Sequence, residues 1–242
     1  MKSRLQMIVL ALVLGTSSIV RAFDHSDYDA ILKQSVDASG QVDYALLKEN
    51  RSSLDAYLEQ TGAISASDFR SWSEAKRLAF LINVYNGETL QLIIDHYPIA
   101  SIKRIGGLLA SPWKIQSVVL FGKETTLDHL EHGIIRVDFS EPRIHFALVC
   151  AAKGCPPLRR EAFTESQLEF QLEDQTRRFL NEKPKNRIEG EILHLSPIFD
   201  WYGDDFTRSG NSLRDFVGRY LSGDAQGKRI RFTHYDWSLN VQ

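Results

Sequence analysis

Several familiar signals are missing from this chain of 242 residues, and each absence narrows the possible classes of function. The sequence has no G-x-S-x-G nucleophile motif, phosphate-binding loop, dinucleotide fingerprint or H-E-x-x-H zinc motif, so most common enzyme classes find no support. Beyond residue 22, no apolar run approaches the roughly 18 residues that cross a membrane. No internal repeat or low-complexity linker marks a second domain.

Basic residues are not in excess either. The chain has 29 Lys and Arg against 31 Asp and Glu, a formal net charge of −2. A surface that binds nucleic acid usually gathers basic residues into a stripe with interleaved aromatic residues. The basic clusters here, DQTRRF and PKNR, are a charged helix face and a loop. We therefore expect no nucleic acid partner.

The first 22 residues are typical of a secretory signal peptide. Two basic residues precede the apolar run MIVLALVLG, and Val20 and Ala22 occupy the −3 and −1 positions of a cleavage site. Cleavage near Ala22 would leave 26 Lys and Arg against 31 Asp and Glu, a formal charge of −5. We expect a mature protein of residues 23–242 that is periplasmic or secreted and has no transmembrane segment.

The mature chain mixes helical and strand-like periodicity without a regular βαβ alternation, which predicts a single α+β domain. Hairpins are expected over residues 113–127, with a turn near Gly122, and over residues 186–196. The apolar segment RIHFALVC is expected to be a strand in the centre of a sheet. We predict that a long buried helix packs on this mostly antiparallel sheet. Further helices are expected in DHSDYDAILKQSV, ALLKENRSSLDAYLEQ, LDHLEHGIIR and SLRDFVGRYL, and strands in GQVDY and KRIRFTHYDW.

Capping signals set the expected ends of two helices. Ser71 and Glu74 have the S-x-x-E spacing of a capping box at the start of the long helix, and Pro98 follows its end. Thr164 and Gln167 form a second such pair before an apolar helical face. These pairs predict helix starts near residues 72 and 165.

Two amides interrupt the most apolar helix of the chain. Asn83 and Asn86 lie within RLAFLINVYNGETLQLI, residues 77–93, although Asn favours turns and caps over helix interiors. A buried amide must find hydrogen-bond partners. These two side chains are therefore expected either to clamp the backbone of a neighbouring loop or to face a polar cleft that binds a ligand.

A second candidate cluster lies in RIHFALVCAAKGCPPLRR. If residues 144–149 form a strand, it carries His145 and delivers Cys150 to its end, with Cys155 returning after a four-residue loop. The nearby Lys153 would favour a thiolate. In an exported protein, the same two cysteines are also expected to form a disulfide. Both possibilities, a reactive thiol and a structural disulfide, remain open at this point.

Two further segments hold candidate polar groups. His129 and His132 are three residues apart on an expected helix, but H-x-x-H alone is a weak metal signal. A metal site of His132, His145 and a thiol is a third hypothesis; our prediction is that the protein uses neither a metal nor another cofactor. In SPIFDWYGDDF, acidic residues flank Trp201, a pattern that suits a sugar or peptide cleft and equally a turn before a helix.

Four ordered motifs, AFLINVYNGETL, LEHGIIR, IHFALVCAAKGCPPL and IFDWYGDDF, together with YDWSLN near the end of the chain, resemble the domain-of-unknown-function family 547. This resemblance spans nearly the whole mature chain. Bacterial members of that family are often exported or lipid-anchored, whereas plant members are fused to a coiled-coil segment and look intracellular. The resemblance implies no activity. The positions that match the family's motifs are Asn83, Tyr85, Asn86, Glu131, His132, Arg136, His145, Cys150, Cys155, Pro156, Trp201 and Trp237.

An enzyme hypothesis follows if these groups converge on one cleft. A long helix followed by a His-bearing strand is the order found in papain-like and transglutaminase-like enzymes, so a distant or degenerate form of that arrangement is one expectation. His145 would be the general base, oriented by Asp200, for acyl transfer or hydrolysis. Cys150 or Cys155 would be the nucleophile, and an amide of the long helix would stabilise the oxyanion.

The alternative hypothesis is a non-catalytic binding or assembly module, in which the polar residues form a buried network and Cys150 and Cys155 a structural disulfide. In either case we expect a small polar or peptide-like ligand, or another protein of the cell envelope, as the partner. The residues expected to bind the ligand are Asn83, Tyr85, Asn86, Glu131, His132, Arg136 and Trp201.

Overall fold

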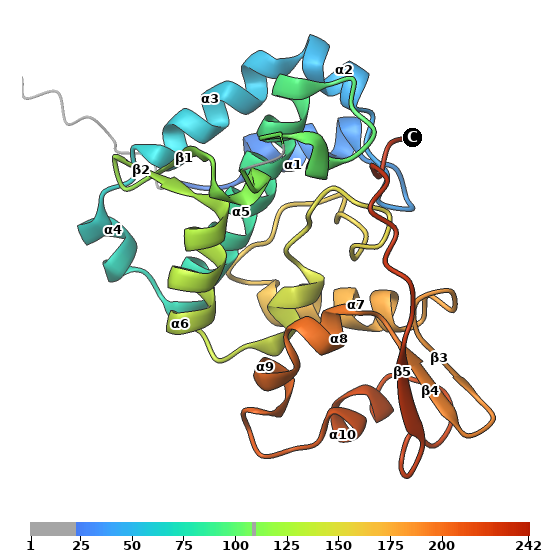
Figure 1. Ribbon diagram of the computed structural model, residues 1–242. Helices are drawn as coiled ribbons and strands as arrows, with labels where there is room; N and C mark the ends of the chain where they lie inside the picture. The colour runs from blue at the N-terminus through green and yellow to red at the C-terminus, as the bar shows by residue number, and fades with distance from the viewer. Residues whose placement is uncertain (1–22, 108–109) are drawn as a thin grey trace, which may run out of the picture.

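The computed structural model describes residues 23–107 and 110–242, which form one α+β domain (Figure 1). The predicted signal peptide, residues 1–22, lies outside the described residues. Within the described part of the chain, no helix is long and apolar enough to cross a membrane. The predicted α+β class is therefore confirmed.

The N-terminal half is a group of helices around one central helix. The long helix α5 is buried on all sides over most of its length and packs against α2 and α3, as Figure 1 shows. Gly87 lies where α5 approaches Leu58 of α3 most closely, since a Cβ there would sit 3.0 Å from a Leu58 methyl group. The helices of this half are α1 (Ser26–Ser35), α2 (Tyr44–Glu49), α3 (Arg51–Gly62), α4 (Ala66–Ser71) and α5 (Glu74–His96).

The start of α5 differs from the predicted capping box. Ser73, not Ser71, is the N-cap, and its side chain accepts a hydrogen bond from the backbone N–H of Lys76. Ser71 instead ends α4, and Glu74 is the first residue of α5. The spacing rule found the correct region but the wrong serine, because two serines lie within three residues. The helix ends at His96, two residues before Pro98, as predicted.

The predicted hairpin at Gly122 is confirmed. Strands β1 (Gln116–Leu120) and β2 (Lys123–Thr126) pair antiparallel, and Phe121 and Gly122 both have positive φ, at 55° and 71°. Positive φ at both central residues is the geometry that matches the twist of a two-residue hairpin. The hairpin packs against α3 and α5.

The remaining strands form a separate sheet at the other end of the molecule (Figure 1). Strand β4 pairs antiparallel with β3 and parallel with β5. The single, mostly antiparallel sheet under the long helix is therefore a wrong prediction, because the strands divide into two small sheets and α5 contacts only the first hairpin among the major contacts. The later elements are η1 (Ile102–Arg104), η2 (Pro112–Lys114), the π-helix η3 (His129–Ile135), α6 (Arg136–Asp138), the 3-10 helix η4 (Pro142–Phe146), α7 (Leu168–Leu180), β3 (Arg187–Glu189), β4 (Ile192–Leu195), α8 (Ile198–Trp201), α9 (Gly203–Thr207), α10 (Leu213–Gly218) and β5 (Arg229–Phe232).

The expected central strand at residues 144–149 is not a strand. Pro142 begins the 3-10 helix η4, and the Glu141 side chain caps it by accepting from the backbone N–H of Arg143. Residues 147–149 then continue as a buried segment without a neighbouring strand. A short apolar run fits a buried strand and a buried irregular segment equally well, and Pro at the first helical position decides for a helical start here.

Side-chain amides supply the hydrogen bonds that a sheet would have given this buried backbone. Asn86 donates to the carbonyl of Ala147 over 2.9 Å and accepts from the N–H of Val149 over 3.0 Å. Gln175 of α7 donates to the carbonyls of Phe146 and Pro157. Buried backbone groups must be paired, and amides can donate and accept at once. The buried segment is thus held from both sides by helices.

Helix α7 also begins later than its predicted capping box implies. Its first residue is Leu168, and Gln167 takes the N-cap position without a side-chain cap. The N–H of Thr164 bonds to the side chain of Gln171 instead, over 3.0 Å. Tertiary hydrogen bonding therefore replaces the local capping box that Thr164 and Gln167 suggested.

The C-terminal half has its own aromatic core. Phe146 of η4 packs against four other phenylalanines, with ring centroids 5.2 to 6.2 Å apart. These four rings come from α7, α8, α9 and α10: Phe179, Phe199, Phe206 and Phe216. Phe146 thus anchors the buried segment in this C-terminal core. Residues 147–149 instead pack into the core of the N-terminal helices.

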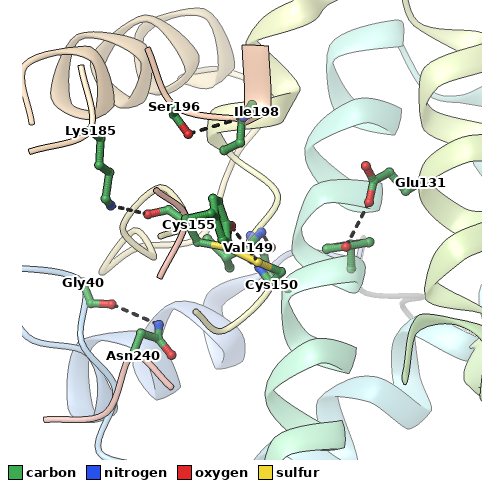
Figure 2. The surroundings of a disulfide bond; sticks show 12 residues. Gly40, Glu131, Val149, Cys150, Cys155, Lys185, Ser196, Ile198 and Asn240 are labelled. Carbon is green, nitrogen blue, oxygen red and sulfur yellow. Dashed lines mark hydrogen bonds between the residues drawn. A yellow bond between two sulfur atoms is a disulfide. The ribbon is translucent and has the colours of Figure 1, made fainter. Parts of the chain in front are cut away.

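The last ten residues form a strap that returns from β5 to the N-terminal helices (Figure 1). Val241 pairs with Val42 in an isolated bridge, and the Asn240 side chain lies 3.5 Å from the Gly40 carbonyl (Figure 2). On its way the strap bonds to the loop 150–155, through Lys153 N–H to the Ser238 carbonyl over 2.8 Å and other backbone pairs. The strap therefore joins the two halves of the domain.

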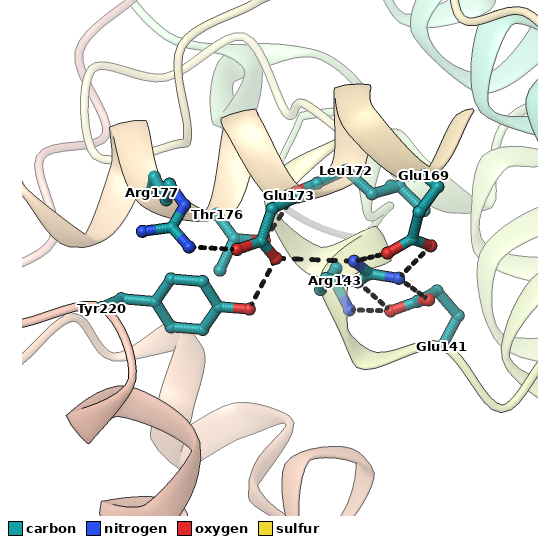
Figure 3. A network of polar contacts seen from close by, with 8 residues as sticks. All are labelled: Glu141, Arg143, Glu169, Leu172, Glu173, Thr176, Arg177 and Tyr220. Atoms are coloured by element: carbon teal, nitrogen blue, oxygen red, sulfur yellow. Dashed lines mark hydrogen bonds and ion pairs between the residues drawn. The ribbon is translucent and has the colours of Figure 1, made fainter. Parts of the chain in front are cut away.

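An ion-pair network surrounds Arg143 of η4 (Figure 3). The Arg143 guanidinium binds Glu141 at 2.6 Å and Glu169 at 2.7 Å, and it lies 3.6 Å from Glu173. Glu173 in turn accepts from the Tyr220 hydroxyl over 2.9 Å. Arg143 thus connects η4 with α7 and, through Tyr220, with the chain after α10.

We expect Arg143→Met to lower the free energy of unfolding by about 2 kcal/mol. The methionine keeps the apolar stem but removes the charge-assisted bonds of a largely buried guanidinium. The bond to Glu141 should contribute more than the bond to Glu169, because Glu169 is exposed. Arg51→Met is the matched control, since Arg51 pairs with Asp55 at an exposed site and should contribute less than about 1 kcal/mol. Urea unfolding of both variants tests this expectation, and equal losses would contradict it.

Candidate functional site

One pocket gathers most of the predicted site residues. It has a volume of about 280 Å³ and lies where η3, the loop 150–155, α8 and the strap meet. Its lining includes Tyr85, Ser111, Trp113, Asp128, Glu131, His132, His145, Leu148, Cys150, Cys155, Pro156, Ile198, Trp201, Tyr202, Tyr235 and Trp237. Residues from six separate segments of the sequence therefore share one concave surface.

Aromatic rings form one wall of the pocket. Tyr235 lies between Trp201 and Trp237, with ring centroids 4.9 and 4.6 Å away, and Trp113 meets Trp237 at 5.9 Å. Trp201 is 47% exposed, although large aromatic side chains are usually covered. Such rings offer flat apolar faces to a ligand while their polar tips remain available for hydrogen bonds.

Glu131 supplies a buried carboxylate to the pocket. It lies on the π-helix η3, a helix type that often occurs at functional sites. Its Oε2 accepts a hydrogen bond from the Tyr85 hydroxyl of α5 over 3.0 Å, and the side chain of Tyr202 also bonds to it. Burial and the negative charge of Glu131 raise the pKa of both tyrosines, so each phenol stays protonated and can donate.

His145 and Asp205 form a second polar group at the pocket. The His145 Nε2 atom lies 2.8 Å from Oδ2 of Asp205, and the imidazole stacks on the Tyr202 ring at a centroid distance of 3.9 Å. Burial lowers the pKa of His145, so the ring is neutral at pH 7. An ionised carboxylate can only accept, so Nε2 carries the proton and Nδ1 keeps its lone pair.

Two arginines hold Asp205 in its ionised form. Arg136 donates from Nε to Oδ2 over 2.6 Å, and Arg208 donates to Oδ1 over 2.8 Å. Burial by itself would raise the pKa of Asp205, but the hydrogen bonds from His145 and Arg136 outweigh it and hold the pKa well below its usual range. The orientation of the imidazole is therefore fixed by a charged, well-supported partner.

The two cysteines form a disulfide in the wall of this pocket (Figure 2). Neither is a free thiol, in agreement with the disulfide expectation. Cys155 is buried, whereas Cys150 is half-buried. The Tyr235 hydroxyl lies 3.1 Å from each sulfur.

The structure gives four predicted residues other surroundings. Asn83 and Asn86 do not line the pocket; both amides clamp backbone, Asn83 at Phe163 and Asn86 at residues 147–149. Asp200 is exposed, and the carboxylate that meets His145 belongs to Asp205. Arg136 lies behind the pocket, where it bonds to His132 and Asp205.

The remaining predicted residues do meet. The pocket brings together Tyr85, Glu131, His132, His145, Cys150, Cys155 and Trp201. Among the described residues, however, no group of three His, Cys, Asp or Glu side chains is arranged to hold a metal ion. The sulfurs that a metal site with His132 and His145 would have used are occupied in the disulfide.

Sequence reasoning missed several residues of the site. Trp113, Tyr202 and Tyr235 line the pocket, and Asp205 supports His145, but none was among the predicted site residues. The acidic and aromatic segment around Trp201 contained both Tyr202 and Asp205. Helix periodicity does not link them to Trp201, because Trp201 ends α8 and Asp205 lies on the separate helix α9. Nothing local distinguished Trp113 or Tyr235.

Comparison with known proteins agrees with the resemblance seen in the motifs. No curated protein and no solved structure matches the chain. The pocket residues of α8 and the strap lie beyond residue 180, outside the segment that matches a family model. Residues 69–180, which contribute Glu131, His145 and the disulfide, match the family model described as "Protein of unknown function, DUF547".

Proposed function

We propose that the protein binds a small polar or peptide-like ligand in the pocket between η3 and the strap. The observation that carries this proposal is the joint presence of the Glu131 carboxylate, the neutral His145 and an aromatic wall on one cavity of about 280 Å³. Ligand sites are typically concave, largely apolar and provided with a few placed polar groups. The volume suits a ligand about as large as a short peptide fragment.

The polar groups define what the ligand should offer. Glu131 and the unprotonated Nδ1 of His145 are acceptors, so the ligand needs hydrogen-bond donors such as amide N–H groups. The rings of Trp201 and Trp237 favour an apolar or CH-rich face on the opposite side. A peptide segment combines both features, which is why we favour a peptide-like ligand.

The disulfide favours binding over cysteine-dependent hydrolysis. Acyl transfer by Cys150 or Cys155 needs a free thiolate, and both sulfurs are engaged with each other. The oxyanion donors of that mechanism are also engaged, since Asn83 and Asn86 hold backbone groups. The proposal is accordingly a binding function in the cell envelope. A disulfide and the leader-like first 22 residues support export.

Tryptophan fluorescence offers a direct test, because three of the four tryptophans line the pocket. In a Trp72→Phe background, which removes the fourth, a panel of end-capped tripeptides is titrated at up to millimolar concentration. We expect at least one peptide to change the emission. If no member of the panel alters the emission or the thermal midpoint, the proposed binding function is wrong.

Glu131→Gln is expected to weaken the binding of such a peptide by about 10- to 100-fold. The substitution keeps the shape and the bond to Tyr85 but removes the charge, and a hydrogen bond to a charged group contributes about 1.5 to 3 kcal/mol. Glu124→Gln, on the exposed β2 strand, is the matched control. An unchanged dissociation constant for Glu131→Gln would remove Glu131 from the site.

A further inference from the structure

The disulfide is placed where a ligand in the pocket can reach it. Both sulfur-bearing residues line the cavity, and the half-buried Cys150 is the more accessible of the two. A disulfide that serves only to hold a loop is normally shielded, and shielded sulfurs exchange slowly with external thiols. This position makes Cys150 Sγ the sulfur that an incoming group would meet first.

Hydrogen-bond donors converge on the other sulfur. The backbone N–H of Cys150 lies 2.9 Å from Cys155 Sγ, and the Tyr235 hydroxyl lies 3.1 Å from this sulfur as well as from Cys150 Sγ. Burial keeps that phenol protonated by raising the pKa of Tyr235. Donors of this kind stabilise a thiolate, and a more stable leaving thiolate speeds thiol–disulfide exchange. The two sulfurs therefore differ in the backbone N–H that only Cys155 Sγ accepts and in the greater exposure of Cys150.

We propose that the Cys150–Cys155 disulfide exchanges with the thiol of a cysteine-containing peptide bound in the pocket. This inference rests on the proposed binding function and assigns its ligand class. The peptide thiol first loses its proton to solvent. Its thiolate then attacks Cys150 Sγ and forms a mixed disulfide, while the electron pair of the broken S–S bond moves to Cys155, which leaves as a thiolate. The peptide sulfur is oxidised and Cys155 is reduced, so the step needs no other oxidant.

The strap keeps the site in place when the disulfide opens. Backbone hydrogen bonds join Lys153 to Ser238 and Gly154 to Asp236, both at 2.8 Å. Gly154 also allows the ring of Tyr235 to lie close, since a Cβ at this position would sit 2.8 Å from the ring. Opening the S–S bond therefore leaves the loop and the Tyr235 hydroxyl positioned around Cys155.

The test measures the rate of exchange with an end-capped tripeptide whose central residue is cysteine. The reference is the cyclised synthetic peptide of residues 149–156, which has the same disulfide without the fold. We expect the full-length protein to react at least about tenfold faster than this reference at the same pH. After quenching by alkylation, mass spectrometry should find the tripeptide on Cys150 and the alkyl group on Cys155. Slower reaction of the folded protein, or the tripeptide on Cys155, would overturn the inference.

A pair of tyrosine variants tests the role of the hydroxyl. Tyr235→Phe removes the donor to Cys155 and should slow the exchange severalfold, whereas Tyr220→Phe removes a hydroxyl bound to Glu173, away from the disulfide, and should not. Circular dichroism checks whether each variant is folded. Equal exchange rates in the two variants would contradict the role of the Tyr235 hydroxyl. If Tyr235→Phe does not fold, the mass spectrometry of the wild-type protein, which locates the tripeptide on Cys150 or Cys155, still decides the inference.

A serine-centred tripeptide separates this inference from the binding proposal. It has nearly the shape of the cysteine peptide but cannot exchange. If the serine peptide binds and the cysteine peptide does not react faster than with the reference, the exchange is wrong and the binding function stands. If the cysteine peptide reacts rapidly on Cys150 while the serine peptide does not bind, the exchange stands and the pocket's non-covalent affinity is wrong.

Discussion

Replacing Asn86 by Ala should lower the free energy of unfolding by about 3 to 5 kcal/mol. The side chain is 2% exposed and makes two hydrogen bonds, to the carbonyl of Ala147 and the N–H of Val149. Alanine leaves both buried backbone groups without this partner, at a cost of about 1 to 3 kcal/mol each, in addition to a small cavity. For a chain of this size the melting temperature should fall by roughly 10 °C.

Asn181→Ala is the matched control for this measurement. Asn181 is exposed, and its amide bonds only to the Arg177 carbonyl of the same helix. The control should lose less than about 1 kcal/mol. Because residues 147–149 lead directly to Cys150, the Asn86 variant should also expose the disulfide to reductants. Similar stabilities for the two variants would show that the clamp does not hold the buried segment.

The second large effect is a dependence of stability on pH that originates at Glu88. This side chain of α5 is 5% exposed and lies behind the β1–β2 hairpin. Burial raises the pKa of Glu88 from 4.5 to about 8; a hydrogen bond from the Val119 backbone opposes the shift, and the charge of Asp95 adds to it. The folded protein therefore holds a proton on Glu88 at pH 7.

The direction of the pH effect follows from the pKa in the two states. In the unfolded chain Glu88 ionises near pH 4.5, whereas the folded protein keeps the proton until about pH 8. The unfolded state thus releases the proton first as the pH rises. The stabilising contribution is complete below pH 4.5 and falls by up to about 1.4 kcal/mol per pH unit until pH 8.

Glu88→Gln should remove this dependence, since an amide does not titrate. The variant and the wild type should be similarly stable near pH 5, and the variant should be more stable by about 4 kcal/mol at pH 8, to order of magnitude. Glu59→Gln is the control, because Glu59 is an exposed residue of α3 that lines the same surface pocket as Glu88. Urea unfolding at pH 5 and pH 8 gives the free energy of unfolding of the wild type and of both variants, and the difference between each variant and the wild type is compared at the two pH values. A constant difference between wild type and Glu88→Gln would place the pKa of Glu88 below the tested range.

Short sequence patterns predicted the elements that depend on neighbouring residues alone. The hairpin at Gly122 was predictable because its turn needs two positive φ angles, and the length of α5 because its apolar run is continuous up to Pro98. The sequence also allowed both hypotheses for Asn83 and Asn86, that they clamp the backbone of a loop or that they face a polar cleft. Choosing between them required knowing what lies opposite, and Phe163 and Ala147 are 80 and 61 residues away.

The site was predictable in its members but not in its pairings. The motifs indicated Glu131, His145 and the cysteines, yet the carboxylate at His145 could have been any of three aspartates near Trp201. Asp205 is selected because α9 places it against Arg136 as well as His145. Tyr235 reaches the disulfide only because the strap crosses the loop 150–155.

Composition, periodicity and short spacing are enough to predict the α+β class, the long buried helix and the closeness of the two cysteines. Tertiary contacts are needed to know that residues 147–149 are clamped by amides instead of paired in a sheet. They are needed also to know that the disulfide faces an aromatic pocket and that His145 pairs with Asp205. These features depend on contacts between residues far apart in the chain, and local spacing contains no information about which distant groups meet.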